Sequence, residues 1–184
     1  MLTKHSMHRI SEHETPILLS ESMALVQQTP WILNKSIREN ILFGNEYDED
    51  KYNETLKICQ LRRDMEILPG GDQTEIGEKG INLSGGQKAR IGLARAVYAD
   101  RELILMDDPI SALDANVKKK IFKSVFMKKF ATKTRILVTH AIDFVHLVDT
   151  IILIKEGRIV LHGPFHEVKE NAYLKELVRI LRSH

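Results

Sequence analysis

The chain has 184 residues, of which 43% are hydrophobic and 28% charged, and its formal net charge is +2. These values are typical of one globular domain, or of two small lobes sharing a core, and the small net charge argues against nucleic acid as a partner. The single cysteine, Cys59, excludes an internal disulfide and favours a reducing compartment. No stretch resembles a signal peptide or reaches the ~20 apolar residues of a membrane helix, so no transmembrane segment is expected.

Residues 1–20 are polar and weakly patterned, which predicts a loose tail. The spacing of His5, His8 and His13 suggests a metal site, but no cluster of carboxylates or cysteines supports one. Residues 21–35 are expected to hold a core strand, in "ESMALVQQTPW", that ends near two glutamines.

Residues 36–98 are predicted to form a mostly helical subdomain. In "NKSIRENILFG", Ser36 and Glu39 have the spacing of a capping box, and Gly44 follows the expected helix end. "DEDKYNETLKICQL" combines an acidic first turn with apolar residues at helical spacing. "LPGGDQTEIGEKG" is rich in glycine and predicts a loop.

The stretch "INLSGGQKARIGLARA" predicts a second capped helix. Ser84 can accept a hydrogen bond from the first turn, and Gln87 can reach back to it. Gly85 and Gly86 leave the first-turn N–H groups uncovered, and the helix dipole attracts an anion there, with phosphate the natural candidate. An ordinary core helix is the other interpretation, because one face is apolar at Leu93, Ala96 and Val97.

Residues 99–184 have a different pattern. "ELILMDDP" and "TRILVTH" are short, unbroken apolar runs, and "NVKKKIFKSVFMKKF" between them has a helical apolar face. This order predicts an α/β fold with a parallel sheet buried on both faces. "TIILIKEGRIVLHG" predicts a hairpin that turns at Glu156–Gly157, and "HEVKENAYLKELVRIL" predicts one amphipathic C-terminal helix.

Polar side chains follow both predicted parallel strands. Asp107 and Asp108 come after the first strand, and His140 comes after the second. Ligands of open parallel sheets bind beyond the carboxyl ends of the strands, and a carboxylate there suits Mg²⁺ beside the phosphates of a nucleotide. The alternatives are turn residues ahead of Pro109 for the aspartates and a core histidine for His140.

Five short motifs, in this order, resemble the nucleotide-binding domains of ABC transporters. "VQQTPWI" resembles the Q-loop, with Gln28 in the functional position, and "LSGGQ" at 83–87 resembles the signature. "LILMDD" at 103–108 resembles Walker B, "SALD" at 111–114 the D-loop, and "LVTH" the switch histidine. "TPWILNKSIRENILFG" and "GEKGINLSGGQ" resemble the C subfamily of multidrug-resistance-associated exporters, and "MDDP" resembles its first nucleotide domain.

The resemblance implies a truncated P-loop NTPase-like ATPase core with a helical subdomain. It further implies a membrane exporter in which two such domains pack head to tail around two ATP molecules, at the cytoplasmic face and against transmembrane domains. Residues 84–87 (Ser84, Gly85, Gly86 and Gln87) would hold the γ-phosphate of the ATP seated on the partner. Asp107 and Gln28 would serve Mg²⁺, His140 would contact the γ-phosphate, and Asp114 would cross the domain interface.

Two departures from the family pattern qualify this expectation. Active members carry glutamate as the general base after the Walker B aspartate, whereas Asp108 is one methylene shorter and should cost rate. The 184 residues also contain no G-x-x-x-x-G-K-[ST] motif, the Walker A loop that wraps phosphates. The chain is therefore expected to be a fragment, inactive alone, that serves the ATPase of its parent transporter.

Two other functions are consistent with the motifs. One is a non-catalytic ABC remnant with a regulatory or interaction role, which the missing Walker A loop favours. The other is a soluble ABC protein that acts on chromosomes or ribosomes. Chromosome-type members interrupt the domain with long coiled coils, whereas a compact helical stretch separates the Q-loop motif from the signature motif here.

Overall fold

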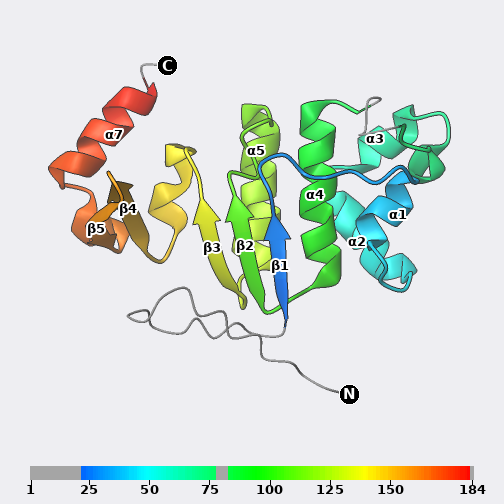
Figure 1. Ribbon diagram of the computed structural model, residues 1–184, viewed down its shortest axis with the longest axis horizontal. Coiled ribbons are helices and arrows are strands. Elements are labelled where there is room, and N and C mark those ends of the chain that lie inside the picture. Colours follow the sequence, from blue (N-terminus) through cyan, green and yellow to red (C-terminus); the bar gives the residue numbers. More distant parts are fainter. Residues whose placement is uncertain (1–21, 78–82, 183–184) are drawn as a thin grey trace. The chain divides into compact units, whose positions relative to one another are not determined.

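A computed structural model describes residues 22–77 and 83–182 of the chain (Figure 1). The fold divides into two compact units, the first ending at Val138 and the second beginning at Thr139. The expected tail, with its three histidines, lies outside the described residues. None of the described helices is long and apolar enough to span a lipid bilayer.

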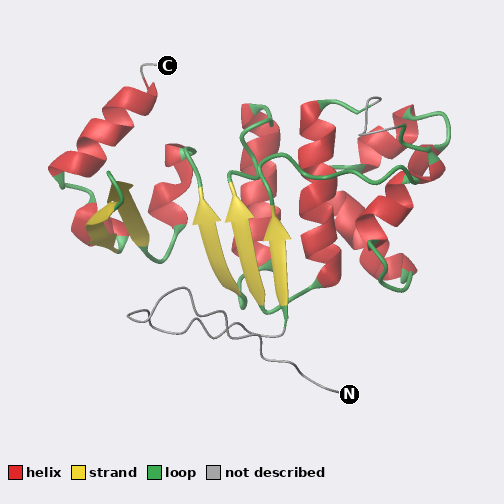
Figure 2. Cartoon of the chain, viewed as in Figure 1, coloured by secondary structure: helices red, strands yellow, loops and turns green. Residues whose placement is uncertain are grey.

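The first unit contains a three-stranded parallel sheet, as the sequence predicts. Its strands are β1 (Met23–Val26), β2 (Leu103–Asp107) and β3 (Thr134–Val138), in the order β1-β2-β3. Val26 lies opposite Met106, and Asp107 opposite Val138. The carboxyl ends of all three strands therefore lie at the same edge of the sheet. Helices connect successive strands, as in an α/β fold (Figure 2).

Only one face of this sheet is covered by the described residues. Ile104 and Met106 are buried, whereas Leu25, Ile136 and Val138 on the opposite face are 58%, 55% and 60% exposed. Among the described residues, the burial that unbroken apolar strands predict for both faces is therefore present on one face. An unbroken apolar strand indicates that both faces of the sheet are apolar. Whether a face is buried depends on helices or other segments that pack against it, and the strand sequence does not specify these.

The helical part of the first unit follows β1. It comprises α1 (Ile37–Leu42), α2 (Glu49–Ile58), α3 (Arg62–Ile67), the 3₁₀ turn η1 (Gly71–Gln73) and α4 (Gly85–Ala99). The capping box that begins α1 is present, with Ser36 and Glu39 bonded reciprocally. The left-handed residue that ends α1 is Phe43, one position before the predicted Gly44, which also has positive φ. No side chain caps α3, and the sequence analysis did not single it out.

The lysine-rich helix after β2 changes its hydrogen bonding partway. An α-helix, α5 (Ala115–Ile121), continues directly as a π-helix, η3 (Phe122–Lys129). At its end the N–H of Phe130 donates to the carbonyl of Val125, an i→i+5 bond of 2.9 Å. The buried residues of this helix and its end are Ile121, Phe122, Val125, Phe126 and Phe130, a larger set than the Ile121 and Val125 that an α-helical face through Val117 predicts.

The second unit contains the predicted hairpin. It consists of a 3₁₀ segment η4 (Ile142–Leu147), the antiparallel strands β4 (Ile151–Lys155) and β5 (Arg158–Gly163), and the helices α6 (Phe165–Val168) and α7 (Ala172–Arg182). Glu156 and Gly157 both have positive φ, as a two-residue hairpin turn requires. The prediction of a single C-terminal helix is wrong, because the structure has two helices there, α6 and α7. The Asn171 side chain accepts a hydrogen bond from the N–H of Tyr173 and thereby caps the start of α7.

The thiol of Cys59 should be inert in the folded chain. Cys59 is the C-cap that follows α2, it is fully buried, and that burial raises the pKa of its thiol. Because the thiolate is the reactive species, we expect a thiol reagent at pH 8 to modify Cys59 at least about 100-fold more slowly in buffer than in 6 M guanidinium. With an aromatic disulfide as the reagent, the absorbance of the aromatic thiolate that it releases measures both rates. Rapid stoichiometric labelling in buffer would show that the helical part opens readily.

Candidate functional site

The N-terminus of α4 is built from the capping box that the sequence predicts. The Ser84 hydroxyl accepts from the N–H of Gln87 at 3.2 Å, and the Gln87 side-chain carbonyl accepts from the N–H of Ser84 at 2.8 Å. Ser84 and Gly85 are exposed, and Gly86 is half-buried. The first turn therefore presents backbone N–H groups beside glycines, an arrangement suited to an anion.

An aspartate from α3 holds this cap in place. One carboxylate oxygen of Asp64 accepts from the Gln87 amide and from the Arg90 guanidinium, each at 2.9 Å. The Asp64 and Arg90 side chains are 13% and 15% exposed, so this ion pair is largely shielded from water. Asp64 is not among the residues expected from the sequence, because nothing local marks a carboxylate whose partner lies 26 residues away.

The loop before α5 lies against the start of α4. A Cβ atom on Gly85 would be 3.8 Å from the Cβ of Ala112, and one on Gly86 would be 3.3 Å from the Ala112 carbonyl oxygen. The structure thus brings the signature motif and the D-loop motif together. They lie at the same end of the unit as the carboxyl ends of the strands (Figure 1).

Asp114, at the end of that loop, is the N-cap of α5. One of its carboxylate oxygens accepts from the N–H groups of Asn116 and Val117, both at 3.0 Å. The hydrogen bond from Val117 is the largest cause that lowers the pKa of Asp114, and the charge of Arg90 adds to it. Asp114 therefore has a structural role within this unit, and its predicted role across an interface stays a prediction.

Two exposed oxygen-bearing side chains lie at the carboxyl edge of the sheet. Asp107 is the last residue of β2, and Gln28 comes two residues after the end of β1. The parallel register places both at the same edge. Carboxylate and amide oxygens are hard ligands that suit Mg²⁺, which usually keeps several waters, so the residues present fit this ion. The described residues contain no group of three or more His, Cys, Asp or Glu placed to hold a metal by themselves.

Asp108 lies in a turn that ties β2 to β3. It is buried and has a φ of 40°, a left-handed conformation that Asp tolerates better than most residues. Its N–H donates to the Val138 carbonyl at 2.8 Å, and its carbonyl accepts from the Ser111 hydroxyl at 2.9 Å. The turn chemistry considered from the sequence is therefore present at Asp108.

His140 belongs to the second unit, two residues after β3 ends. The predicted approach of His140 to the site therefore remains a prediction.

A buried polar cluster joins the segment after β1 to α1 and α4. Asn40 is fully buried, and its amide oxygen accepts from the N–H of Leu33 at 2.8 Å. The two hydrogens of its amide nitrogen are shared among three carbonyls within hydrogen-bond distance, those of Leu33, Lys35 and Ser36. The guanidinium of Arg95 donates to the Asn40 carbonyl at 2.6 Å, to the Asn40 amide oxygen and to the Trp31 carbonyl. Neither Asn40 nor Arg95 is marked by a local sequence pattern, because the bonds between them join residues 55 positions apart.

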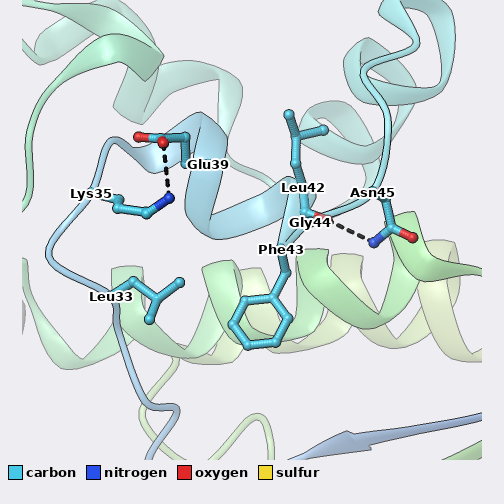
Figure 3. Close-up of a pocket in the computed structure, with 7 residues that line it drawn as sticks. All are labelled: Leu33, Lys35, Glu39, Leu42, Phe43, Gly44 and Asn45. Atoms are coloured by element: carbon cyan, nitrogen blue, oxygen red, sulfur yellow. Dashed lines mark hydrogen bonds and ion pairs between the residues drawn. The ribbon is translucent and has the colours of Figure 1, made fainter.

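A shallow pocket adjoins this cluster (Figure 3). It lies between the segment after β1 and the end of α1, and Lys35 and Glu39 form an ion pair of 3.2 Å beside it. The ring of Phe43 is half exposed, with the Arg95 guanidinium 4.7 Å from the ring centre. The residues that line the pocket are Leu33, Lys35, Glu39, Leu42, Phe43, Gly44 and Asn45.

Comparison with known proteins identifies the family. A model of the family described as ABC transporter matches residues 2–111. The chain is 52% identical over 157 residues to ABC transporter C family member 8 of Dictyostelium discoideum. This alignment covers 84% of this chain and 10% of that protein. The chain is 52% identical over 154 residues to ATP-binding cassette sub-family C member 2 of Rattus norvegicus, and 49% identical over 154 residues to sub-family C member 3 of Homo sapiens. Each of these two alignments covers 83% of this chain and 10% of the relative.

The chain thus spans about a tenth of the length of the curated relatives it matches. The family match includes the Q-loop motif, the signature motif and the Walker B motif with Asp107 and Asp108. These motifs occupy the first unit, at the carboxyl edge of the sheet and at the start of α4. The chain belongs to the ABC transporter family and, within it, to the C subfamily.

Proposed function

We propose that this chain contributes half of a composite ATP site to a membrane exporter, with the start of α4 contacting an ATP bound by a second nucleotide-binding domain. The observation that carries the proposal is the exposed, glycine-lined first turn of α4, held by the Ser84–Gln87 capping box and by Asp64. The backbone N–H groups of this turn, the Ser84 hydroxyl and the Gln87 side chain would face the γ-phosphate. Asp114 would lie at the interface with the second domain.

A second nucleotide, bound by this domain itself, would lie at the carboxyl edge of the sheet. Asp107 and Gln28 would hold Mg²⁺ beside that nucleotide. Bound there, the ion would neutralise charge on the β- and γ-phosphates. Asp108 would accept a proton from the attacking water, and His140 would contact the γ-phosphate as a hydrogen-bond donor. These roles rest on the position of Asp107 and Gln28 at one edge of the sheet and on the family.

The partners that this function requires are a second nucleotide-binding domain, packed head to tail, and transmembrane domains on the cytoplasmic face of a membrane. Nucleic acid is not among them. A non-catalytic remnant is the second candidate function, favoured by Asp108 in place of glutamate and by the absence of a G-x-x-x-x-G-K-[ST] motif from the 184 residues. Such a remnant would associate with its partner without regard to nucleotide.

Nucleotide-dependent association tests the proposal. The purified chain would be mixed with the second nucleotide-binding domain of a C-subfamily transporter, made unable to hydrolyse ATP, and its mass followed by light scattering. We expect a heterodimer with Mg-ATP and none with Mg-ADP, because only ATP presents a γ-phosphate to the start of α4. Association that is equal with both nucleotides would favour the remnant, and no association by a folded chain would contradict both functions.

Lengthening the side chain at position 108 should raise hydrolysis. In a transporter that contains this domain, Asp108→Glu adds the methylene that brings a carboxylate closer to the attacking water, and we expect turnover at this domain's own site to rise roughly tenfold. Single-site turnover with the second site blocked measures it. Asp108→Asn, which has the length of aspartate but no charge, is the matched control and should not rise. Equal rates for Asp108→Glu and the unchanged protein would show that Asp108 does not limit this site.

A further inference from the structure

The side chain of Arg95 joins three segments that are far apart in the sequence. From the middle of α4, its guanidinium donates to the carbonyl and amide oxygens of Asn40 in α1 and to the carbonyl of Trp31. Burial lowers the pKa of Arg95 to about 10, so placing this charge here has a cost in hydration. The three hydrogen bonds offset that cost, and they need the planar fork of nitrogens that only arginine has.

A second contact holds the same segment one helical turn earlier. Gly92 of α4 lies so close to Pro30 that a Cβ atom on Gly92 would be 2.6 Å from the Pro30 Cγ. Gly92 and Arg95 are three residues apart and therefore lie on the same face of the helix. Pro30 and Trp31 are thus fixed against α4 at two adjacent points, although the Trp31 side chain is 66% exposed.

Gln28 lies two residues before this fixed pair. It is exposed, and it follows the buried end of β1 at Val26. The freedom of Gln28 is therefore limited on one side by the sheet and on the other by the contacts of Pro30 and Trp31 with α4. The helix that makes these contacts is the one that begins at Ser84.

We propose that Arg95 is a positioning residue that fixes the Gln28-bearing segment to α4. The Arg95 bond to Trp31 makes this segment and the start of α4 parts of one rigid body, so that Gln28 and Ser84 keep a constant separation. What Gln28 then does for a nucleotide rests on the proposed function, whereas the fixing of the segment by Arg95 does not.

The test measures backbone motion in the 184-residue chain. We expect the ¹⁵N order parameter of the Trp31 amide to be about 0.85 in the unchanged chain, as for rigid backbone, in spite of the exposed side chain. In Arg95→Lys, which keeps the charge but provides one nitrogen in place of three, we expect a fall below about 0.6 at Trp31 and at Gln28. A Trp31 value below about 0.6 in the unchanged chain would overturn the proposal without any variant.

Tyr98→Phe is the matched control. Tyr98 lies on the same helix, one turn after Arg95, and its hydroxyl donates to the Glu46 carbonyl at 2.6 Å and accepts from the N–H of Asp48 at 2.8 Å. Removing the Tyr98 hydroxyl destabilises the same unit but leaves the hydrogen bond between Arg95 and Trp31 in place. We expect the Trp31 and Gln28 order parameters to stay unchanged in this variant. An equal fall in both variants would assign the effect to general loosening and overturn the proposal.

A kinetic measurement separates this inference from the proposed function. In a transporter that contains this domain, Arg95→Lys should lower kcat for ATP at least fivefold and leave KM unchanged, because Gln28 is displaced while nucleotide binding is not. Order parameters that fall together with kcat support both ideas. Order parameters that fall while kcat stays constant support the positioning role and contradict the proposed role of Gln28. Order parameters that do not fall overturn the inference, whatever the turnover.

Discussion

Gly85→Asp should abolish the contribution of this domain to ATP turnover and leave its fold intact. The substitution places a carboxylate on the first residue of α4, where the proposed function brings a γ-phosphate. Two like charges 4 Å apart repel by about 1 kcal/mol in water and about 4 kcal/mol at the lower effective dielectric of a protein surface. We therefore expect turnover by a reconstituted transporter that contains this domain to fall at least about tenfold.

The fold has room for this side chain. The nearest atom to a Cβ on Gly85 is the Cβ of Ala112, at an ordinary contact distance of 3.8 Å. A carboxylate in the first turn also interacts favourably with the helix dipole, so the melting temperature should not fall. Gly85→Asn has the same shape without the charge and should keep most of the turnover. If the Asp variant turned over ATP at the unchanged rate, the assignment of residues 84–86 to a phosphate would be wrong.

Asn40→Ala should destabilise the first unit more than any surface substitution. The fully buried amide of Asn40 is bonded to the backbone of Leu33, Lys35 and Ser36 and to Arg95. Each buried polar group left without a partner costs about 1–3 kcal/mol, so we expect a loss of about 3 kcal/mol or more in the free energy of unfolding. Urea denaturation followed by the fluorescence of Trp31, the sole tryptophan, reports on this unit directly.

Asn53→Ala is the control for this substitution. It makes the same chemical change at an exposed position of α2 and should alter the free energy of unfolding by less than about 0.5 kcal/mol. The urea midpoints of the two variants should differ clearly. Equal midpoints would mean that water replaces the Asn40 amide at little cost and that the cluster is less closed than the structure describes.

The local features of the fold could be predicted from the sequence because their partners lie within a few residues. Both capping boxes join residues three apart, Ser36 with Glu39 and Ser84 with Gln87, and both are present. The hairpin turn at Glu156–Gly157 needs only two residues that accept positive φ. The apolar runs that end at Asp107 and Val138 predicted parallel strands, and hence the edge of the sheet that carries Asp107.

The same local rules fail where the outcome depends on hydrogen bonds or packing that short patterns do not specify. The lysine-rich segment has the apolar spacing of an α-helix, yet its second half is a π-helix that also buries Phe122 and Phe126. The break between α6 and α7 is different, because the bond from Tyr173 to the Asn171 side chain is local, and Asn171 is an N-cap residue that the sequence already marks.

The sequence alone therefore pointed to the family, the parallel sheet and the capping box at the start of α4, because these depend on short motifs and on bonds between near neighbours. The tertiary structure alone decided which face of the sheet is covered and which side chains hold the site in place. Asp64 acts on Gln87 across 23 residues, and Arg95 acts on Asn40 and Trp31 across 55 and 64 residues. No pattern within a few residues marks such partners, because the chain between them must fold before their hydrogen bonds can form.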